Sequence, residues 1–224
     1  MKAHFTDNGY AVIPDSVDQN QINFIGHAVS EFEGCRVGTR RLLEQPWCQE
    51  TARSLRASKI VQQLLGTDFA AIQCTYFEKS PSQNWLVSLH QDLSIPLRER
   101  TKYSVCRAWS EKEGVLFAQP PHDVLEHLVA VRLHLDDSLR SNGPLRVVPG
   151  SHRHGRLTPD QARTLRLAFG EQECLVSRGG VLVMRPLILH ASSKSETSAP
   201  RRVLHFVFGP RRLPHGLEWQ IAIQ

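Results

Sequence analysis

The hydrophobic residues of this chain follow a helical spacing near the N-terminus and a strand-like spacing after it. Apolar positions recur every three or four residues in 18–33 and again in 48–65, which predicts two amphipathic helices. Gly66 directly follows the second run and is a typical helix-stop signal. The first quarter of the chain is therefore expected to be helical.

From residue 68 onward, short apolar runs are separated by Pro, Gly, Ser and Asn, a pattern typical of β-strands. The runs are FAAIQCTYFE, WLVSLHQDLSI, VLFAQ, LVAVRLHLDD, PLRVVPG, CLVSRGGVLVM and RVLHFVFG. One helix is expected among them. Thr158, Pro159 and Gln161 have the pattern of an N-cap, a first-turn proline and a capping-box partner, and Gly170 ends the run.

Helices followed by many short strands predict a mainly β fold with flanking helices. A jelly roll is the first candidate, because a cavity between two paired sheets can hold a site, and an open α+β sheet is the alternative. We expect one domain over residues 1–224, with a helical part at 1–67 packed on a core at 68–210. Within it, segment 98–128 is longer than a turn and indicates either a lid or a structural decoration.

Composition excludes several classes of protein. Of the 224 residues, 41% are hydrophobic and 22% charged, as in globular proteins, and no apolar run approaches the length of a membrane span. The first residues lack a signal-peptide pattern. Five cysteines without a Cys-x-x-Cys pair argue against disulfides or a zinc ribbon and favour the cytoplasm. The net charge of +5 is scattered without a nucleic-acid motif, so we expect a small-molecule substrate, compatible with an anionic one.

The stretch WLVSLHQDLSIPL places a histidine and an aspartate two positions apart in an apolar run. Residues i and i+2 of a strand point to the same face, so His90 and Asp92 should project together. An imidazole and a carboxylate are two of the three ligands in the facial triad of non-haem iron(II) oxygenases. The third ligand would be a histidine from a distant strand, and His190 at the end of GGVLVMRPLILH is the candidate.

Other histidines compete for that role. His152 and His154 in PGSHRHG form a rival His-x-His pair, although their turn favours exposure to water. His134 and His205 lie in predicted strands and are equally compatible with hydrogen-bonded core positions, as is His190 itself. The residue types alone leave these alternatives open.

The segment after His190 favours a dicarboxylate co-substrate. It returns as a strand that opens with Arg201 and Arg202. In an oxygenase that uses 2-oxoglutarate, the keto-acid end chelates iron and the far carboxylate needs a fixed cation, which the guanidinium fork of arginine supplies. The hydroxyl of Ser192 is a candidate second donor to the same carboxylate.

Three elements together resemble the phytanoyl-CoA dioxygenase family: HQD at 90–92, NGPLRVVPGSH at 142–152, and the tail from His190 to Arg201. The resemblance extends from about Gln73 to Phe208. It implies a double-stranded β-helix, a jelly-roll variant, and an oxygenase that depends on Fe(II) and 2-oxoglutarate and consumes O2. The turns at 142–143, expected as a hairpin, and at PGSH would be architecture rather than ligands.

By this resemblance, His90, Asp92 and His190 match the catalytic iron ligands. Arg201 matches the arginine that holds the distal carboxylate, with Arg202 as the fallback, because a slip of one residue turns the other side chain inward.

Further residues carry over less directly. Ser192 matches a hydroxyl partner of that carboxylate, and Gln73 stands where relatives place an amide near the co-substrate. Trp85, Trp109 and Arg132 are candidates for substrate contact, with plain packing as the competing interpretation.

The carboxylate of the triad distinguishes reaction types. Halogenating relatives replace it with a small residue, so Asp92 favours hydroxylation of a C–H bond, with release of succinate and CO2. Two alternatives stay open. One is a cupin-like metal enzyme that does not use 2-oxoglutarate, against which Arg201 and Ser192 argue, and the other is a non-catalytic jelly-roll binding domain.

Overall fold

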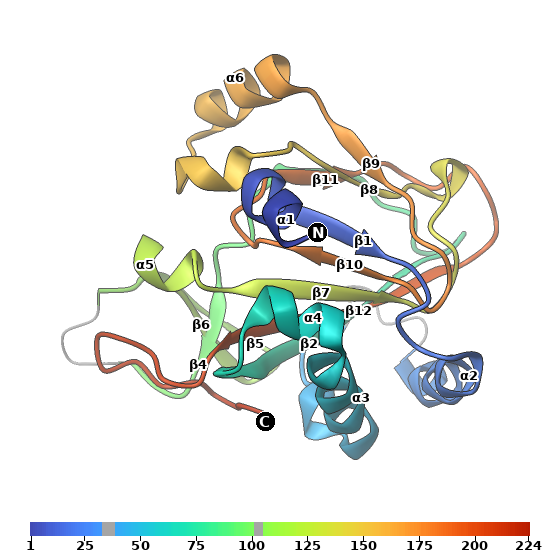
Figure 1. Ribbon diagram of the computed structural model, residues 1–224, viewed down its shortest axis with the longest axis horizontal. Coiled ribbons are helices and arrows are strands. Elements are labelled where there is room, and N and C mark those ends of the chain that lie inside the picture. The colour runs from blue at the N-terminus through green and yellow to red at the C-terminus, as the bar shows by residue number, and fades with distance from the viewer. Residues whose placement is uncertain (33–38, 101–104) are drawn as a thin grey trace.

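Antiparallel strands make up most of the structure, a computed structural model that describes residues 1–32, 39–100 and 105–224 (Figure 1). The α-helices are α1 (Lys2–Asn8), α2 (Gln19–Ala28), α3 (Pro46–Ala57), α4 (Lys59–Leu65), α5 (His122–Leu125) and α6 (Pro159–Phe169). The strands are β1 (Tyr10–Ile13), β2 (Phe69–Lys79), β3 (Val87–His90), β4 (Ile95–Leu97), β5 (Arg107–Lys112), β6 (Val115–Gln119), β7 (Val129–His134), β8 (Leu145–Val147), β9 (Gln172–Cys174), β10 (Val181–Met184), β11 (His190–Ser192) and β12 (Arg201–Pro210).

The strands form three sheets. The larger sheet has the order β1-β10-β7-β12-β2, a second has the order β3-β11-β8-β9, and a third has β4-β6-β5. The chain crosses between the first two sheets from β2 to β3, from β7 to β8, from β9 to β10, from β10 to β11 and from β11 to β12. The second sheet lies over the first (Figure 1). This arrangement confirms the predicted mainly β fold with a double-stranded β-helix core, and the open α+β sheet is wrong.

The alternation of side chains along β12 separates the apolar core from the cavity. Leu204, Phe206 and Phe208 face outward into the main hydrophobic cluster, whereas Arg201 and His205 face inward and line a cavity between the sheets. Burying each of the three apolar side chains contributes about 1.5–3 kcal/mol to folding. The same strand therefore anchors the fold on one face and presents polar groups on the other.

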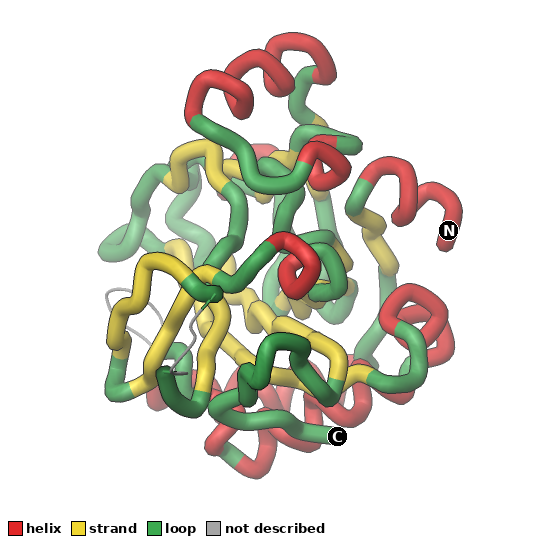
Figure 2. The backbone as a smooth tube through the Cα atoms, turned by 90° about the vertical axis from the view of Figure 1, so that its left-hand side faces the viewer, coloured by secondary structure: helices red, strands yellow, loops and turns green. Residues whose placement is uncertain are grey.

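Helices cover the outer face of the larger sheet (Figure 2). Ile22 and Ile25 of α2 and Leu55 of α3 belong to the same buried cluster as the outward side of β12. The predicted helix at 18–33 is α2, continued by a 3-10 turn at Val29–Phe32. The prediction of one helix over 48–65 was wrong, because Ser58 adopts a ψ of 124° and separates α3 from α4.

The third predicted helix is α6, which lies beside the second sheet (Figure 1). Its capping box is present. The Thr158 hydroxyl accepts from the Gln161 backbone N–H at 3.3 Å, and the Gln161 side chain accepts from the Thr158 N–H at 2.8 Å. Gly170 follows the last turn as expected.

Two sequence-based expectations need correction. The N-terminal part is not purely helical, because β1 pairs antiparallel with β10 at the edge of the larger sheet. The turn at Asn142–Gly143 does not connect a hairpin, because β7 and β8 belong to different sheets. It ends a short 3-10 helix, and Gly143 adopts a left-handed φ of 66°.

The segment expected at 98–128 contains a β-hairpin, although residues 101–104, including Tyr103, lie outside the described part. Strands β5 and β6 are joined at Glu113 and Gly114, whose φ values of 55° and 74° are those of a two-residue hairpin turn. β6 also pairs with β4, so the hairpin extends the sheet that borders the cavity. Lys112, Phe117 and Gln119 of this hairpin line the cavity wall.

Two findings bear on the composition-based expectations. No helix in the described ranges is long and apolar enough to cross a membrane. Cys48, Cys74 and Cys174 are buried free thiols, and Cys35 lies outside the described residues. The cytoplasmic location stays a prediction.

Candidate metal centre and co-substrate site

The second sheet brings the three predicted metal ligands together. His90 ends β3 and His190 begins β11, and the two residues stand opposite each other in the antiparallel pairing. Their Nε2 atoms lie 3.6 Å from Oδ1 and 3.6 Å from Oδ2 of Asp92, respectively. One ligand atom from each of the three residues lies within 4.8 Å of the others. This spacing fits a single metal ion between them.

The strand carrying the first ligand ends earlier than expected. β3 stops at His90, so Asp92 is not on the strand face that the i, i+2 argument assumed. Instead, the backbone N–H of Asp92 donates to the carbonyl of Pro186 at 2.9 Å, in the turn that precedes His190. This bond ties the aspartate to the segment that supplies the third ligand.

Both histidines are held in the tautomer that a metal requires. Nδ1 of His90 donates to the Ser88 carbonyl at 2.8 Å, and Nδ1 of His190 donates to the Ile188 carbonyl at 2.9 Å. With the proton on Nδ1, the lone pair of each Nε2 points toward Asp92. In both cases the acceptor is the carbonyl two residues earlier, so the backbone itself fixes the ring orientation.

Protonation states also suit a metal site. Burial lowers the pKa of His190 to about 4, which keeps its imidazole neutral at pH 7. Burial alone would raise the pKa of Asp92, but His190, His90 and His205 together hold it below its usual value. Burial lowers the pKa of His90, but its hydrogen bond to Asp92 and the charge of that carboxylate raise it overall. Two imidazoles and one carboxylate are the donor set of a facial triad with an open side.

A second cluster of polar groups lies at the other end of β12. Arg201 begins that strand and stands opposite Lys79, the last residue of β2. Lys79 donates to the Ser192 hydroxyl at 2.7 Å and contacts the Ser193 carbonyl. Only 2% of Lys79 and 5% of Arg201 are exposed, so two buried cations and a hydroxyl meet at one wall of the cavity.

The turn at Asn142–Gly143 positions this cluster. The carbonyl of Asn142 accepts from Arg201 Nε at 3.2 Å, and the carbonyl of Gly143 accepts from the Ser192 hydroxyl at 2.9 Å. The turn was expected to have a structural role, and its two carbonyls orient Arg201 and Ser192.

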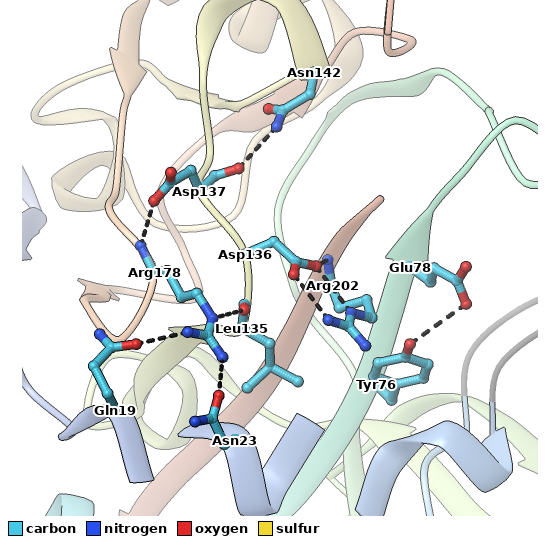
Figure 3. Close-up of polar contacts among 10 residues, drawn as sticks. All are labelled: Gln19, Asn23, Tyr76, Glu78, Leu135, Asp136, Asp137, Asn142, Arg178 and Arg202. Atoms are coloured by element: carbon cyan, nitrogen blue, oxygen red, sulfur yellow. Dashed lines mark hydrogen bonds and ion pairs between the residues drawn. The ribbon is translucent and has the colours of Figure 1, made fainter. Parts of the chain in front are cut away.

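Arg202 points away from the cavity. Its Nε and Nη2 each donate at 2.9 Å to the carboxylate of Asp136, and its backbone N–H donates to the same group (Figure 3). Neighbouring residues of a strand face opposite sides, so this pairing turns Arg201 inward. Of the two arginines, Arg201 is the one that lines the cavity.

The triad and the Arg201 cluster share one cavity of about 410 Å³. The family model described as phytanoyl-CoA dioxygenase (PhyH) matches residues 5–203 of the chain. The chain belongs to the phytanoyl-CoA dioxygenase family.

One curated relative in this family is phytanoyl-CoA dioxygenase domain-containing protein 1 of Danio rerio, 24% identical over 220 residues. The match covers 92% of this chain and 62% of the relative, so the chain spans about three-fifths of that protein's length.

Solved structures with the same fold include members with metal and co-substrate in place. EctD from S. alaskensis with 2-oxoglutarate and 5-hydroxyectoine aligns with a TM-score of 0.70, 18% identity and coverage of 93% of this chain and 74% of that one. The non-heme alpha ketoglutarate dependent epimerase SnoN from nogalamycin biosynthesis aligns with a TM-score of 0.69, 14% identity and coverage of 93% and 79%. HygX from Streptomyces hygroscopicus with nickel and 2-oxoglutarate bound aligns with a TM-score of 0.62 and 18% identity, and the alignment covers 92% of this chain and 84% of that one.

In this member of the phytanoyl-CoA dioxygenase family, a third histidine adjoins the metal centre. Nε2 of His205 lies 3.8 Å from Oδ2 of Asp92, and its Nδ1 accepts from Nη1 of Arg132 at 2.9 Å. Because a guanidinium can only donate, the proton of this imidazole is on Nε2. Burial lowers the pKa of His205 to about 3, so the ring stays neutral. With its Nε2 protonated, His205 faces Asp92 as a donor and not as a metal ligand.

The rival histidines lie elsewhere. Nε2 of His152 donates to the Thr6 carbonyl, and the ring of His154 lies beside Phe169. His134 is buried without a hydrogen-bond partner for either ring nitrogen in the described residues, and burial lowers its pKa. None of these three lines the cavity.

The remaining candidates divide between the cavity and the surrounding protein. Gln73, Trp85 and Arg132 line the cavity, and the Gln73 amide donates to Thr75 at 2.9 Å. Trp109 does not line it. The Trp109 ring packs against a buried hydrophobic cluster, and the Arg100 guanidinium lies 5.4 Å from the ring centre. Of the two interpretations given for Trp109, packing therefore describes its position and substrate contact does not.

Sequence reasoning missed Lys79. The available signal was the alternation along β2, which places Lys79 on the same face as Gln73, Thr75 and Phe77, all of which line the cavity. A lysine at a strand end is usually exposed, so the residue type predicted a surface position and not one in the cavity wall.

Replacing Gly143 by alanine should destabilise the protein and weaken the Arg201 cluster. The φ of 66° disfavours any side chain by about 1–2 kcal/mol, and a Cβ would lie 2.3 Å from the Ser193 carbonyl oxygen. We expect the midpoint of urea unfolding to fall by more than the backbone cost alone would produce, because the clash with Ser193 adds to it. Gly114→Ala is the matched control, because its φ is 74° and nothing lies within 4 Å of a Cβ. Equal losses in both variants would contradict the positioning role of the turn.

Proposed function

We propose that this protein is an Fe(II)- and 2-oxoglutarate-dependent oxygenase that hydroxylates a C–H bond of a small molecule and releases succinate and CO2. The observation that carries the proposal is the union, in one cavity, of a His-Asp-His triad and a separate buried cluster of Arg201, Lys79 and Ser192. A dicarboxylate with a keto acid at one end requires both. Membership of the phytanoyl-CoA dioxygenase family supports the same activity.

His90, Asp92 and His190 would hold the iron, whose chemistry is the activation of O2 coupled to oxidative decarboxylation of the keto acid. Arg201 would pair with the distal carboxylate of 2-oxoglutarate through its guanidinium, and the Lys79 ammonium would add a second charge. Ser192 and Gln73 would complete the polar wall around the co-substrate. The backbone carbonyls that accept from His90, His190 and Arg201 keep these groups oriented before any ligand binds.

Asp92 supports hydroxylation rather than halogenation, because it occupies the position where a small residue would leave room for a halide. Related folds also include an epimerase and a carbocyclase, so the reaction outcome needs a direct test. The extension of one domain over residues 1–224, the small-molecule partner and the absence of nucleic-acid binding stay predictions.

The test is turnover under isotopically labelled O2 with a panel of small molecules. Hydroxylation predicts succinate release together with one labelled oxygen atom in the product. Succinate release with an unlabelled, isomerised or cyclised product would replace hydroxylation by another oxidation. A cupin-like enzyme without 2-oxoglutarate would act on its substrate without making succinate.

The affinity for 2-oxoglutarate should fall as pH rises through about 7. Burial, followed by the nearby Arg201, lowers the pKa of Lys79 to about 7. Below that pH the ammonium is charged and attracts the distal carboxylate, and above it the neutral amine does not. Calorimetric titrations of Mn(II)-loaded protein between about pH 6.5 and 9 measure the effect. Lys79→Met should bind weakly with a flat profile, and Lys79→Arg tightly with a flat profile. An unchanged slope in Lys79→Met would contradict the assignment.

A further inference from the structure

Arg132 is a buried cation that forms no ion pair with the described residues. It lies on β7, only 7% of it is exposed, and it lines the cavity. Its Nη1 donates to His205, and its Nε has no hydrogen-bond partner among the described residues. The centre of the Phe77 ring lies 5.6 Å from its guanidinium carbon. Within the described ranges, no carboxylate lies at ion-pair distance from it. Buried guanidinium groups are normally paired, so this one is prepared for a ligand.

The charge of the cavity indicates the sign of that ligand. Arg40 is already paired, because its Nη1 lies 3.1 Å from the carboxylate of Glu113. The other cationic side chains of the wall are Lys79, Lys112, Arg132 and Arg201, and the carboxylates are Glu78 and Asp92. With Lys79 protonated and the histidines neutral, these six residues leave an excess of two positive charges. A divalent metal ion and the dianion of 2-oxoglutarate would cancel each other. The excess therefore remains after both have bound, and it favours an anionic primary substrate.

Arg132 is separate from the cluster that would take the distal carboxylate. In the register of the larger sheet, Arg132 stands opposite His205, whereas Lys79 stands opposite Arg201. Arg201 and His205 are four residues apart on β12, which corresponds to about 13 Å along an extended strand. His205 in turn lies 3.8 Å from Asp92. Arg132 is therefore at the metal end of the cavity.

The donors left on Arg132 match a carboxylate. Nη1 is taken by His205, and the edge formed by Nε and Nη2 makes no hydrogen bond with the described residues. Two parallel N–H groups on one edge of the fork fit the two oxygens of a carboxylate. His205 and Phe77 hold the guanidinium in place, so the binding edge is oriented in advance.

We propose that Arg132 binds a carboxylate of the primary substrate beside the metal, so that the substrate class is small carboxylic acids. This inference rests on the proposed function, because it treats Arg201 and Lys79 as already occupied by 2-oxoglutarate. Arg132 acts by orienting the substrate relative to the metal, and specificity for acids over neutral analogues follows from its unpaired charge.

The test uses Mn(II)-loaded protein saturated with 2-oxoglutarate, so that binding is measured without turnover. A panel of aliphatic and aromatic monocarboxylic acids and the matching primary amides is titrated by calorimetry. The parent protein should prefer acids over their amides by about tenfold or more, as expected for one charge-assisted pair. Arg132→Gln should lose that preference, and Arg132→Lys should keep part of it. The affinity for 2-oxoglutarate itself should change less than about threefold in Arg132→Gln.

Three results would overturn the proposal. One is a parent protein that binds acids and amides equally or binds neither. The second is an acid preference that survives in Arg132→Gln. The third is a loss of 2-oxoglutarate affinity in Arg132→Gln as large as that in Arg201→Gln, which would assign Arg132 to the metal-chelating carboxylate of the co-substrate.

Two further readouts keep the test interpretable. If Arg201→Gln leaves the affinity for 2-oxoglutarate unchanged, the proposed function fails independently of Arg132. Near-ultraviolet circular dichroism reports folding. If Arg132→Gln does not fold, Arg132→Lys decides, because the ammonium retains the charge but not the paired donors, and an acid preference equal to the parent's would then contradict the proposal.

Discussion

His190→Ala is expected to lose Fe(II) affinity by more than about 100-fold. Even residues that only support metal ligands cost 10- to 100-fold when mutated, and here one of three direct ligands is removed. His205 does not substitute for His190, because its imidazole presents a proton to Asp92 and not a lone pair to the metal. Anaerobic calorimetry with Fe(II) measures the loss.

His152→Ala is the matched control for that variant. His152 belongs to the rival His-x-His pair, and its Nε2 donates to the Thr6 carbonyl, away from the cavity. We expect His152→Ala to bind Fe(II) like the parent. Loss of iron binding in this variant, with retention in His190→Ala, would mean that the metal centre has been assigned to the wrong histidines.

Arg201→Gln should weaken the binding of 2-oxoglutarate by about 10- to 100-fold while leaving the metal site intact. A hydrogen bond to a charged group contributes about 1.5–3 kcal/mol, and each 1.4 kcal/mol corresponds to a factor of ten in affinity. Calorimetric titration of the Mn(II)-loaded variant with 2-oxoglutarate gives the ratio. At low 2-oxoglutarate, Arg201→Gln should produce much less succinate than the parent protein. Saturating 2-oxoglutarate should bring its succinate production closer to that of the parent.

Arg202→Gln separates a local charge effect from co-substrate binding. It removes a cation from the adjacent position, but that cation pairs with Asp136 and faces away from the cavity (Figure 3). We expect Arg202→Gln to lose some resistance to urea and to keep the parent affinity for 2-oxoglutarate. The opposite result, with Arg202→Gln weakened and Arg201→Gln unchanged, would reverse the assignment of the two arginines.

The sequence predicted the fold, and it pointed to the HQD element as a candidate metal site, because these signals are local. The alternation in RVLHFVFG and LVAVRLHLDD requires strands with one apolar face, and both form in the larger sheet. The HQD element was identifiable from residue type and spacing, whereas His190 was chosen among the rival histidines through the resemblance to the phytanoyl-CoA dioxygenase family. The strand was wrongly extended through Asp92, because only the bond to Pro186 shows where β3 stops.

The remaining parts of the site depend on strand register, which one sequence does not reveal. Lys79 meets Arg201, and Arg132 meets His205, only because β12 pairs with β2 and β7 in a particular alignment. The four-residue strand β1 was missed for a related reason, since its pairing with β10 and not its length makes it a strand. The Asn142–Gly143 turn was expected to form a hairpin because Asn-Gly is typical of two-residue hairpin turns, whereas here the same pair ends a 3-10 helix.

The most direct test of the central claim is an anaerobic titration of the metal-free protein with Fe(II) and then with 2-oxoglutarate, following the visible metal-to-ligand charge-transfer band. Chelation of iron by the keto acid in this cavity predicts a band in the parent protein, no band in His190→Ala, and a band in Arg201→Gln only at much higher 2-oxoglutarate. Folded, iron-loaded parent protein that shows no band would contradict the 2-oxoglutarate chemistry, and folded protein that takes up no iron would contradict the metal centre itself.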